Sequence, residues 1–161
     1  MKRAIIQTFV IWVTLASGTS AQGMPSLPPP PGQDPFVGTW RANRDKSRPK
    51  LDDTDASYLR TILREGDEIV FFSRINLSER HKVVERHYRY RCDGKPHPVP
   101  QGSVSCIYRA ANLIESEASS PDGKYYLTSE VSADGQEVRI LSYRNKTRTK
   151  LKSAWVMDRV H

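Results

Sequence analysis

Apolar and polar residues alternate with a period of two along most of the chain after residue 36. Between Ile69 and Ile75, for example, the odd positions hold three apolar residues and Ser73. A period of two is typical of a β-strand, whose successive side chains point to opposite faces. Similar stretches occupy residues 82–92, 103–110, 112–119, 124–132, 137–143 and 150–160.

Short, turn-forming connections join these stretches. Pro121-Asp122-Gly123 and Asp134-Gly135 are typical of tight β-turns. Residues 93–98 contain Gly94, Pro96 and Pro98, which favour a connection without regular structure. Eight or nine strands with short links predict an all-β fold, either a sandwich or a barrel.

Residues 54–65 fit two patterns. Between Asp52 and Gly66, four apolar residues would lie on one face of a short helix: Tyr58, Leu59, Ile62 and Leu63. The same segment also alternates as a strand, which would turn at residues 65–67 into the next strand. We favour the hairpin, because the strand that follows is rich in β-branched and aromatic residues and needs a partner.

The N-terminal residues have the layout of a secretory signal peptide. Lys2 and Arg3 precede a mostly apolar run over residues 4–16, and small residues follow up to Ala21. The run is too short and too interrupted for a retained membrane span. We therefore expect cleavage after Ala21, a periplasmic or secreted protein, and no stable membrane span after signal cleavage.

Three segments follow from this division: a signal peptide over residues 1–21, a linker over residues 22–35 and a barrel domain over residues 36–161. The linker is rich in proline, which fixes the backbone and removes amide donors, so an extended, disordered tether is expected. The whole chain has a formal charge of +7, and removal of Lys2 and Arg3 leaves 7 − 2 = +5.

The two cysteines of the chain, Cys92 and Cys106, both lie in the exported part and are expected to form a disulfide. Each has the same parity as its apolar or aromatic neighbours, so two adjacent antiparallel strands would bring them together. Closing a loop of about 15 residues adds about 3 kcal/mol of stability. A redox or metal role would need a motif such as Cys-x-x-Cys, which is not present.

No catalytic or cofactor-binding motif is present, so we expect a protein that is not an enzyme and uses no cofactor or metal. His81 and His87 share one strand face but lie about 20 Å apart at the rise of a β-strand. In residues 87–91, tyrosines alternate with arginines, which separates them onto two faces and argues against a nucleic-acid platform. An anionic envelope polymer or lipid headgroup could still meet Arg89, Arg91 and residues 144–152.

The stretch Phe36-Val37-Gly38-Thr39-Trp40 resembles the start of a lipocalin, and with Asp34-Pro35 and Lys46-Ser47 it resembles lipocalin-like domain proteins of the secreted bacterial type with unassigned function. Further similar points are residues 90–99, 121–124, 132–136 and 157–159. The chain departs from the lipocalin pattern in having no helix after the barrel. The resemblance implies an antiparallel up-and-down β-barrel that binds a small molecule.

The resemblance also implies structural roles at the closed end of the barrel. Gly38 would allow close approach of another segment, and Trp40 would be covered by an arginine from the end of the chain. Arg159 is our choice for that arginine, and Arg144 is the alternative.

The interior of such a barrel could hold one small amphipathic or hydrophobic ligand. The wall candidates are polar groups on otherwise apolar faces: Arg86, Tyr88, Tyr90, Tyr125 and Ser129. Arg86 shares its parity with Val84 and both tyrosines, so an inward face would place a charge inside the barrel. A bulge after Val84 would instead turn Arg86 outward.

Overall fold

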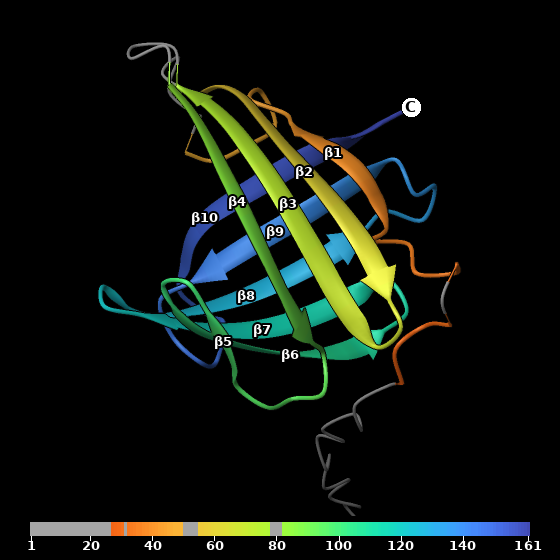
Figure 1. Ribbon diagram of the computed structural model, residues 1–161. Coiled ribbons are helices and arrows are strands. Elements are labelled where there is room, and N and C mark those ends of the chain that lie inside the picture. The colour runs from red at the N-terminus through yellow and green to blue at the C-terminus, as the bar shows by residue number, and fades with distance from the viewer. Residues whose placement is uncertain (1–26, 31, 50–54, 78–81) are drawn as a thin grey trace, which may run out of the picture.

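A computed structural model of the protein describes residues 27–30, 32–49, 55–77 and 82–161. The expected signal peptide lies outside these residues. In the described part of the chain, ten antiparallel strands form one sheet that curls into an up-and-down barrel (Figure 1). The strands are β1 (Gly38–Ala42), β2 (Asp55–Glu65), β3 (Glu68–Leu77), β4 (Lys82–Arg91), β5 (His97–Val99), β6 (Gly102–Ala110), β7 (Leu113–Ser120), β8 (Gly123–Val131), β9 (Glu137–Tyr143) and β10 (Leu151–Val160).

The all-β barrel is confirmed, with one strand more than the eight or nine expected. The additional strand is β5, which lies in the stretch expected to be irregular. β5 bonds to β6 on one side and is an edge of the sheet on the other. Pro98 is tolerated there because an edge strand does not need every backbone donor.

The segment with two possible patterns is a strand. β2 and β3 form a hairpin whose residues pair from Asp55–Leu77 to Glu65–Glu68. Gly66 has φ +63° in the turn, a conformation that glycine adopts readily. The hairpin places Tyr58 and Ile62 in the core and leaves Leu63 on the outer surface.

The disulfide is confirmed. The sequence analysis expected it to join two adjacent strands, but β4 and β6 are not neighbours in the sheet. The strand order runs from β4 at one edge through β1 and β10 to β5 at the other. Cys92 directly follows β4 and bonds to Cys106 in β6, with 4.6 Å between their Cα atoms. The bond therefore ties the two sides of the barrel seam together.

One end of the barrel is closed by a buried cluster. Trp40, Val131 and Met157 are fully buried there, and Tyr108 is 1% exposed. The segment just before β1 packs against this cluster through Phe36, whose ring lies 6.3 Å from that of Tyr108. Asp34 is buried as well. The buried cluster at this end therefore includes residues from the segment before β1.

None of the described residues forms a helix that is long and apolar enough to span a membrane.

Candidate functional site

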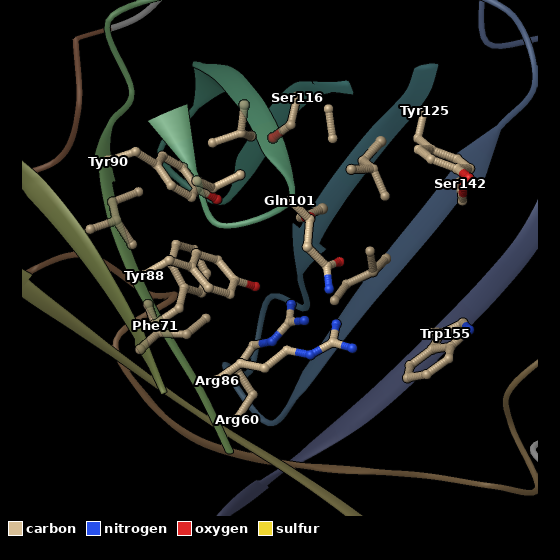
Figure 2. A pocket seen from close by; sticks show the side chains of 18 of the residues that line it. Arg60, Phe71, Arg86, Tyr88, Tyr90, Gln101, Ser116, Tyr125, Ser142 and Trp155 are labelled. Carbon is tan, nitrogen blue, oxygen red and sulfur yellow. The ribbon is translucent and has the colours of Figure 1, made fainter. Parts of the chain in front are cut away.

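The interior of the barrel is a cavity of about 1050 Å³ (Figure 2). Toward the closed end, its floor is apolar and includes Ile62, Ile69, Val138 and Met157. Toward the other end, near the β5–β6 and β7–β8 turns, the lining becomes polar, with Gln101, Ser119 and Asp122 among its residues. Apolar space that leads to a polar mouth suits a molecule with an apolar body and a polar group.

All five wall candidates from the sequence line this cavity: Arg86, Tyr88, Tyr90, Tyr125 and Ser129. Arg86, Tyr88 and Tyr90 come from β4, and Tyr125 and Ser129 come from β8 on the opposite wall. The register between β3 and β4 is continuous along Arg86, so no bulge turns that side chain outward. Arg86 points into the cavity, and its side chain is exposed to solvent at the mouth.

A second arginine, Arg60 of β2, joins Arg86 in the cavity. Ser73 of β3 pairs with Arg60 on one side and with Arg86 on the other, so these three residues form a single row across the strands. Figure 2 shows the two guanidinium groups next to each other, with Gln101 pointing into the same space. The sequence analysis missed Arg60, although its parity with Tyr58 and Ile62 places it on the inward face.

The two arginines differ in their contacts. Arg60 donates from Nε to the Tyr58 hydroxyl over 3.0 Å, and its Cζ atom lies 5.8 Å from the centre of the Phe71 ring. Arg86 forms no hydrogen bond or ion pair with any described residue. No described carboxylate lies within ion-pair distance of either guanidinium group. A charge inside a barrel is costly unless it meets water or an opposite charge. Arg86 is exposed at the mouth, so water can meet it, and its donors have no partner among the described residues.

An aromatic cluster lies next to the arginine row, on the side toward the closed end of the barrel. Phe71 stacks on Tyr88 and on Tyr90 with ring centres 5.3 and 5.1 Å apart, at angles of 20° and 21°. Burial is the main cause that raises the pKa of Tyr90, and the nearby Tyr88 adds to it. The Tyr90 phenol therefore stays protonated at neutral pH and can donate a hydrogen bond.

The opposite wall carries hydroxyl groups instead of charges. Ser116, Leu127, Ser142 and Ser153 form one row across β7 to β10, and Ser129 and Trp155 lie one row deeper. At the mouth, the Lys152 ammonium lies 4.6 Å from the centre of the Tyr125 ring. No local sequence pattern could indicate this hydroxyl row, because its members come from four separate strands.

The closed end contains the contact that the lipocalin resemblance implies. The Arg159 Cζ atom lies 4.2 Å from the centre of the Trp40 ring. Arg159 also donates to three backbone oxygens, those of Gly135 over 2.6 Å, Val37 over 2.8 Å and Pro35 over 2.7 Å. Gly38 has φ +141°, and a side chain there would collide with this guanidinium. The alternative, Arg144, lies in the β9–β10 turn.

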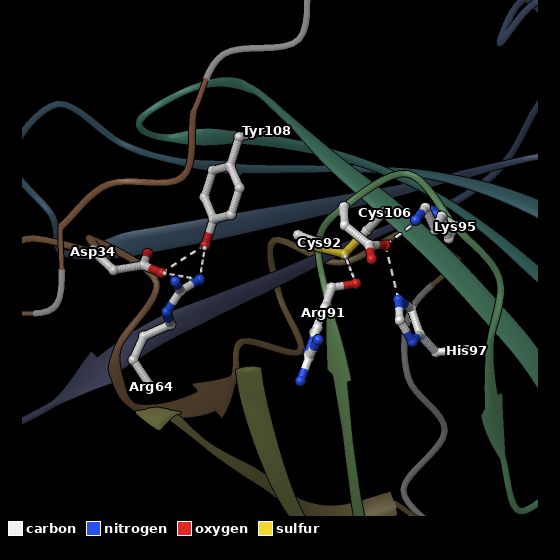
Figure 3. Close-up of a disulfide and its surroundings, with 9 residues drawn as sticks. Asp34, Arg64, Arg91, Cys92, Lys95, His97, Cys106 and Tyr108 are labelled. Atoms are coloured by element: carbon white, nitrogen blue, oxygen red, sulfur yellow. Dashed lines mark hydrogen bonds and ion pairs between the residues drawn. A yellow bond between two sulfur atoms is a disulfide. The ribbon is translucent and has the colours of Figure 1, made fainter. Parts of the chain in front are cut away.

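A buried ion pair, which sequence reasoning missed, holds the segment before β1 in place (Figure 3). Tyr108 donates from its hydroxyl to Asp34 Oδ2 over 2.5 Å, and Arg64 Nη1 lies 3.7 Å from the same oxygen. The Arg64 and Asp34 side chains are 5% and 1% exposed. Burial and the hydrogen bond to Asp34 raise the pKa of Tyr108. No local pattern could reveal this network, because Asp34 lies in a proline-rich stretch.

Three of the outward arginines that could meet an anionic polymer, Arg89, Arg91 and Arg148, are paired with carboxylates. Arg89 lies 3.1 Å from Glu65 and 3.3 Å from Glu68, and Arg91 lies 3.3 Å from Asp67. In the β9–β10 turn, Arg148 lies 3.6 Å from Glu115. These carboxylates neutralise part of the positive charge on the surface.

The remaining candidate ligands of a metal ion are scattered. His97 contacts Asp93 over 2.8 Å, and this contact is the first cause that lowers the pKa of Asp93. His87 stacks on Phe72 with ring centres 4.4 Å apart. Within the described part of the chain, no three or more His, Cys, Asp or Glu residues are placed to hold a metal ion.

No family model matches the sequence, and no curated protein sequence matches it either. Solved structures do match the fold. A mutant of the fluorescent protein UnaG has a TM-score of 0.56 at 11% identity, covering 79% of this chain and 97% of its own. Fatty-acid-binding protein 1 of Echinococcus granulosus has a TM-score of 0.55 at 10% identity, covering 80% and 99%.

The fatty-acid-binding protein of Schistosoma mansoni, in complex with arachidonic acid, has a TM-score of 0.55 at 11% identity and covers 80% and 98%. At such low identity these similarities establish the fold alone. The chain is a lipocalin-like β-barrel of the kind found in fatty-acid-binding proteins.

Proposed function

We propose that this protein is an exported, non-enzymatic carrier that binds one small amphipathic molecule inside its barrel. The observation that carries the proposal is the cavity of about 1050 Å³, with its apolar floor and its unpaired arginine row. A volume of this size is ample for one lipid-like or drug-sized molecule. Neighbours of the same fold that are named fatty-acid-binding proteins add support.

The chemistry of the walls gives the bound molecule an orientation. Its apolar part would lie on the floor formed by Ile62, Ile69 and Met157, because this buries apolar surface on both partners. Its polar group would then lie at the level of Arg60 and Arg86, where donors without protein partners are available. Tyr88, Tyr90, Tyr125 and Ser129 would supply further contacts along the walls.

Export is part of the same proposal. It rests on the signal-like residues 1–21 and on the Cys92–Cys106 disulfide, a bond that persists in oxidising compartments such as a periplasm or the extracellular space. The second function considered from the sequence, binding of anionic envelope polymers or lipid headgroups through surface Arg and Lys residues, has less support, because Arg89 and Arg91 are each paired with a carboxylate.

Native mass spectrometry of protein purified from its own cells tests the proposal directly. We expect a stoichiometric small molecule, identified by extraction and analysis of what travels with the protein. Arg86→Ala should reduce the bound fraction, while Arg89→Ala, on the outer face of the same strand, should retain it.

A second experiment blocks the cavity. Ser129→Trp introduces an indole into the interior, whereas Thr128→Trp places the same indole on the outer face of β8. We expect the first variant to lose binding of the fluorescent amphiphile 1-anilinonaphthalene-8-sulfonate and the second to bind it as the wild type does. Equal binding by both variants would show that the probe lies outside the barrel, and the proposed function would then be wrong.

A further inference from the structure

The lining of the cavity carries more positive than negative charge. This excess indicates which polar group an amphipathic ligand would carry. Arg60 and Arg86 bring two positive charges to one row, and Lys152 adds a third cation at the mouth. Of the described acidic residues, only Glu85 and Asp122 line the cavity. Glu85 neighbours Arg86 on the outward parity and lies 3.9 Å from Arg74 Nε. Asp122 is exposed in the β7–β8 turn.

The position between the two arginines is small and already hydrogen-bonded. Ser73 is 4% exposed, and its Oγ lies 3.3 Å from the Tyr58 hydroxyl. Ser73 therefore offers no charge to its neighbours. Strands lie about 4.8 Å apart, so the backbones of β2 and β4 are separated by about 10 Å. Figure 2 shows the Arg60 and Arg86 side chains reaching into the same part of the cavity.

Two like charges that converge in a partly enclosed space repel each other, and an anion between them removes this cost. A carboxylate or sulfate ester would balance only one charge. A phosphate monoester carries about −1.5 to −2 at neutral pH and offers three acceptor oxygens to the planar, fork-like guanidinium groups.

We propose that Arg60 and Arg86 form a dianion site, and that the molecule held in the barrel is an amphiphile with a phosphate monoester or phosphonate group. This inference rests on the proposed function. The phosphoryl group would lie between the two guanidinium groups, the amide of Gln101 would face it from the mouth, and the apolar chain would extend past Phe71 toward the floor.

Three decyl amphiphiles with the same chain test the inference by calorimetric titration at pH 8, below their micelle concentrations. Decyl phosphate is a dianion, decyl sulfate is a monoanion of the same tetrahedral shape, and decanoate is a planar monoanion. We expect decyl phosphate to bind about tenfold more tightly than either monoanion, a factor within reach of one additional charge-assisted contact.

Arg60→Gln and Arg86→Gln should each bring the affinity for decyl phosphate close to that for decyl sulfate, because one guanidinium remains. Arg89→Gln, on the outer face of β4, should leave the tenfold preference unchanged. Equal binding of phosphate and sulfate by the wild-type protein would overturn the dianion site, as would equal losses for all three amphiphiles in the glutamine variants.

Inorganic phosphate separates a headgroup from a free ion. We expect it to displace decyl phosphate only at a concentration at least about a hundredfold higher, because it buries no apolar chain. Equal potency would identify a free ion as the ligand and overturn the assignment to an amphiphile. If the proposed carrier function is wrong, none of the three amphiphiles would bind, so this outcome can be distinguished from failure of the dianion site alone.

Discussion

The arginines at the closed end of the barrel and those in its cavity have opposite surroundings. Arg159 donates to three backbone oxygens and covers Trp40, and Arg64 is buried against Asp34. In the cavity, Arg60 contacts a tyrosine hydroxyl, and Arg86 has no hydrogen-bond or ion-pair partner among the described residues. The first pair meets acceptors that the fold supplies, whereas the second leaves donors for something else.

This difference predicts which charges within one barrel are structural and which are available to a ligand. A buried charge whose partner is removed destabilises a protein strongly, while a charge that faces solvent in an open cavity can be removed at little cost. Substitutions in the closed-end pair should therefore lower stability. Substitutions in the cavity pair should weaken ligand binding and leave stability nearly unchanged.

The largest effect is expected at Asp34. Asp34→Ala removes the acceptor of the Tyr108 hydroxyl and leaves Arg64 as an unpaired buried cation. We expect the free energy of unfolding, measured by urea titration, to fall by about 3–5 kcal/mol. In the double variant Asp34→Ala/Arg64→Leu no buried charge remains, so part of the loss should be regained. Similar stabilities of wild type and Asp34→Ala would show that the ion pair does not hold the closed end.

A smaller loss is expected at Arg159. Arg159→Ala removes the hydrogen bonds to three backbone oxygens and a cation–π contact with Trp40 worth about 0.5–2 kcal/mol. Because neighbouring water can replace part of this bonding, we expect a net loss of about 2–3 kcal/mol. Arg159→Lys keeps the charge over the indole but not the three-way bonding, and its stability should lie between the two. An unchanged thermal midpoint for Arg159→Ala would contradict the structural role.

Most of the fold could be predicted from the sequence, because strand formation and side-chain parity are local properties. The alternation in Ile69, Phe71 and Ser73 correctly gave the inward face of β3. The short strand β5 could not be predicted, because its pairing with β6 depends on where the sheet ends. For the same reason the disulfide partners were identified but their position across the seam was not.

The candidate site was predictable only where a single strand carries the signal. Arg86, Tyr88 and Tyr90 share one parity within β4 and were found together. Arg60 also carried a parity signal, but its segment fitted a helix as well as a strand. The row through Ser73 could be recognised only from the register of three strands, and the pairing of Asp34 with Tyr108 spans 74 positions of the chain.

The smallest effect on stability is expected at Arg86, where the comparison is sharpest. Arg86→Gln removes a cation that has no described partner and relieves its repulsion with Arg60, so no contact within the fold is lost. We expect the free energy of unfolding of the ligand-free protein to change by less than about 0.5 kcal/mol. The same variant should lose the preference for decyl phosphate over decyl sulfate. A loss of stability near that of Arg159→Ala would instead make Arg86 a structural residue, and the distinction between the two pairs of arginines would fail.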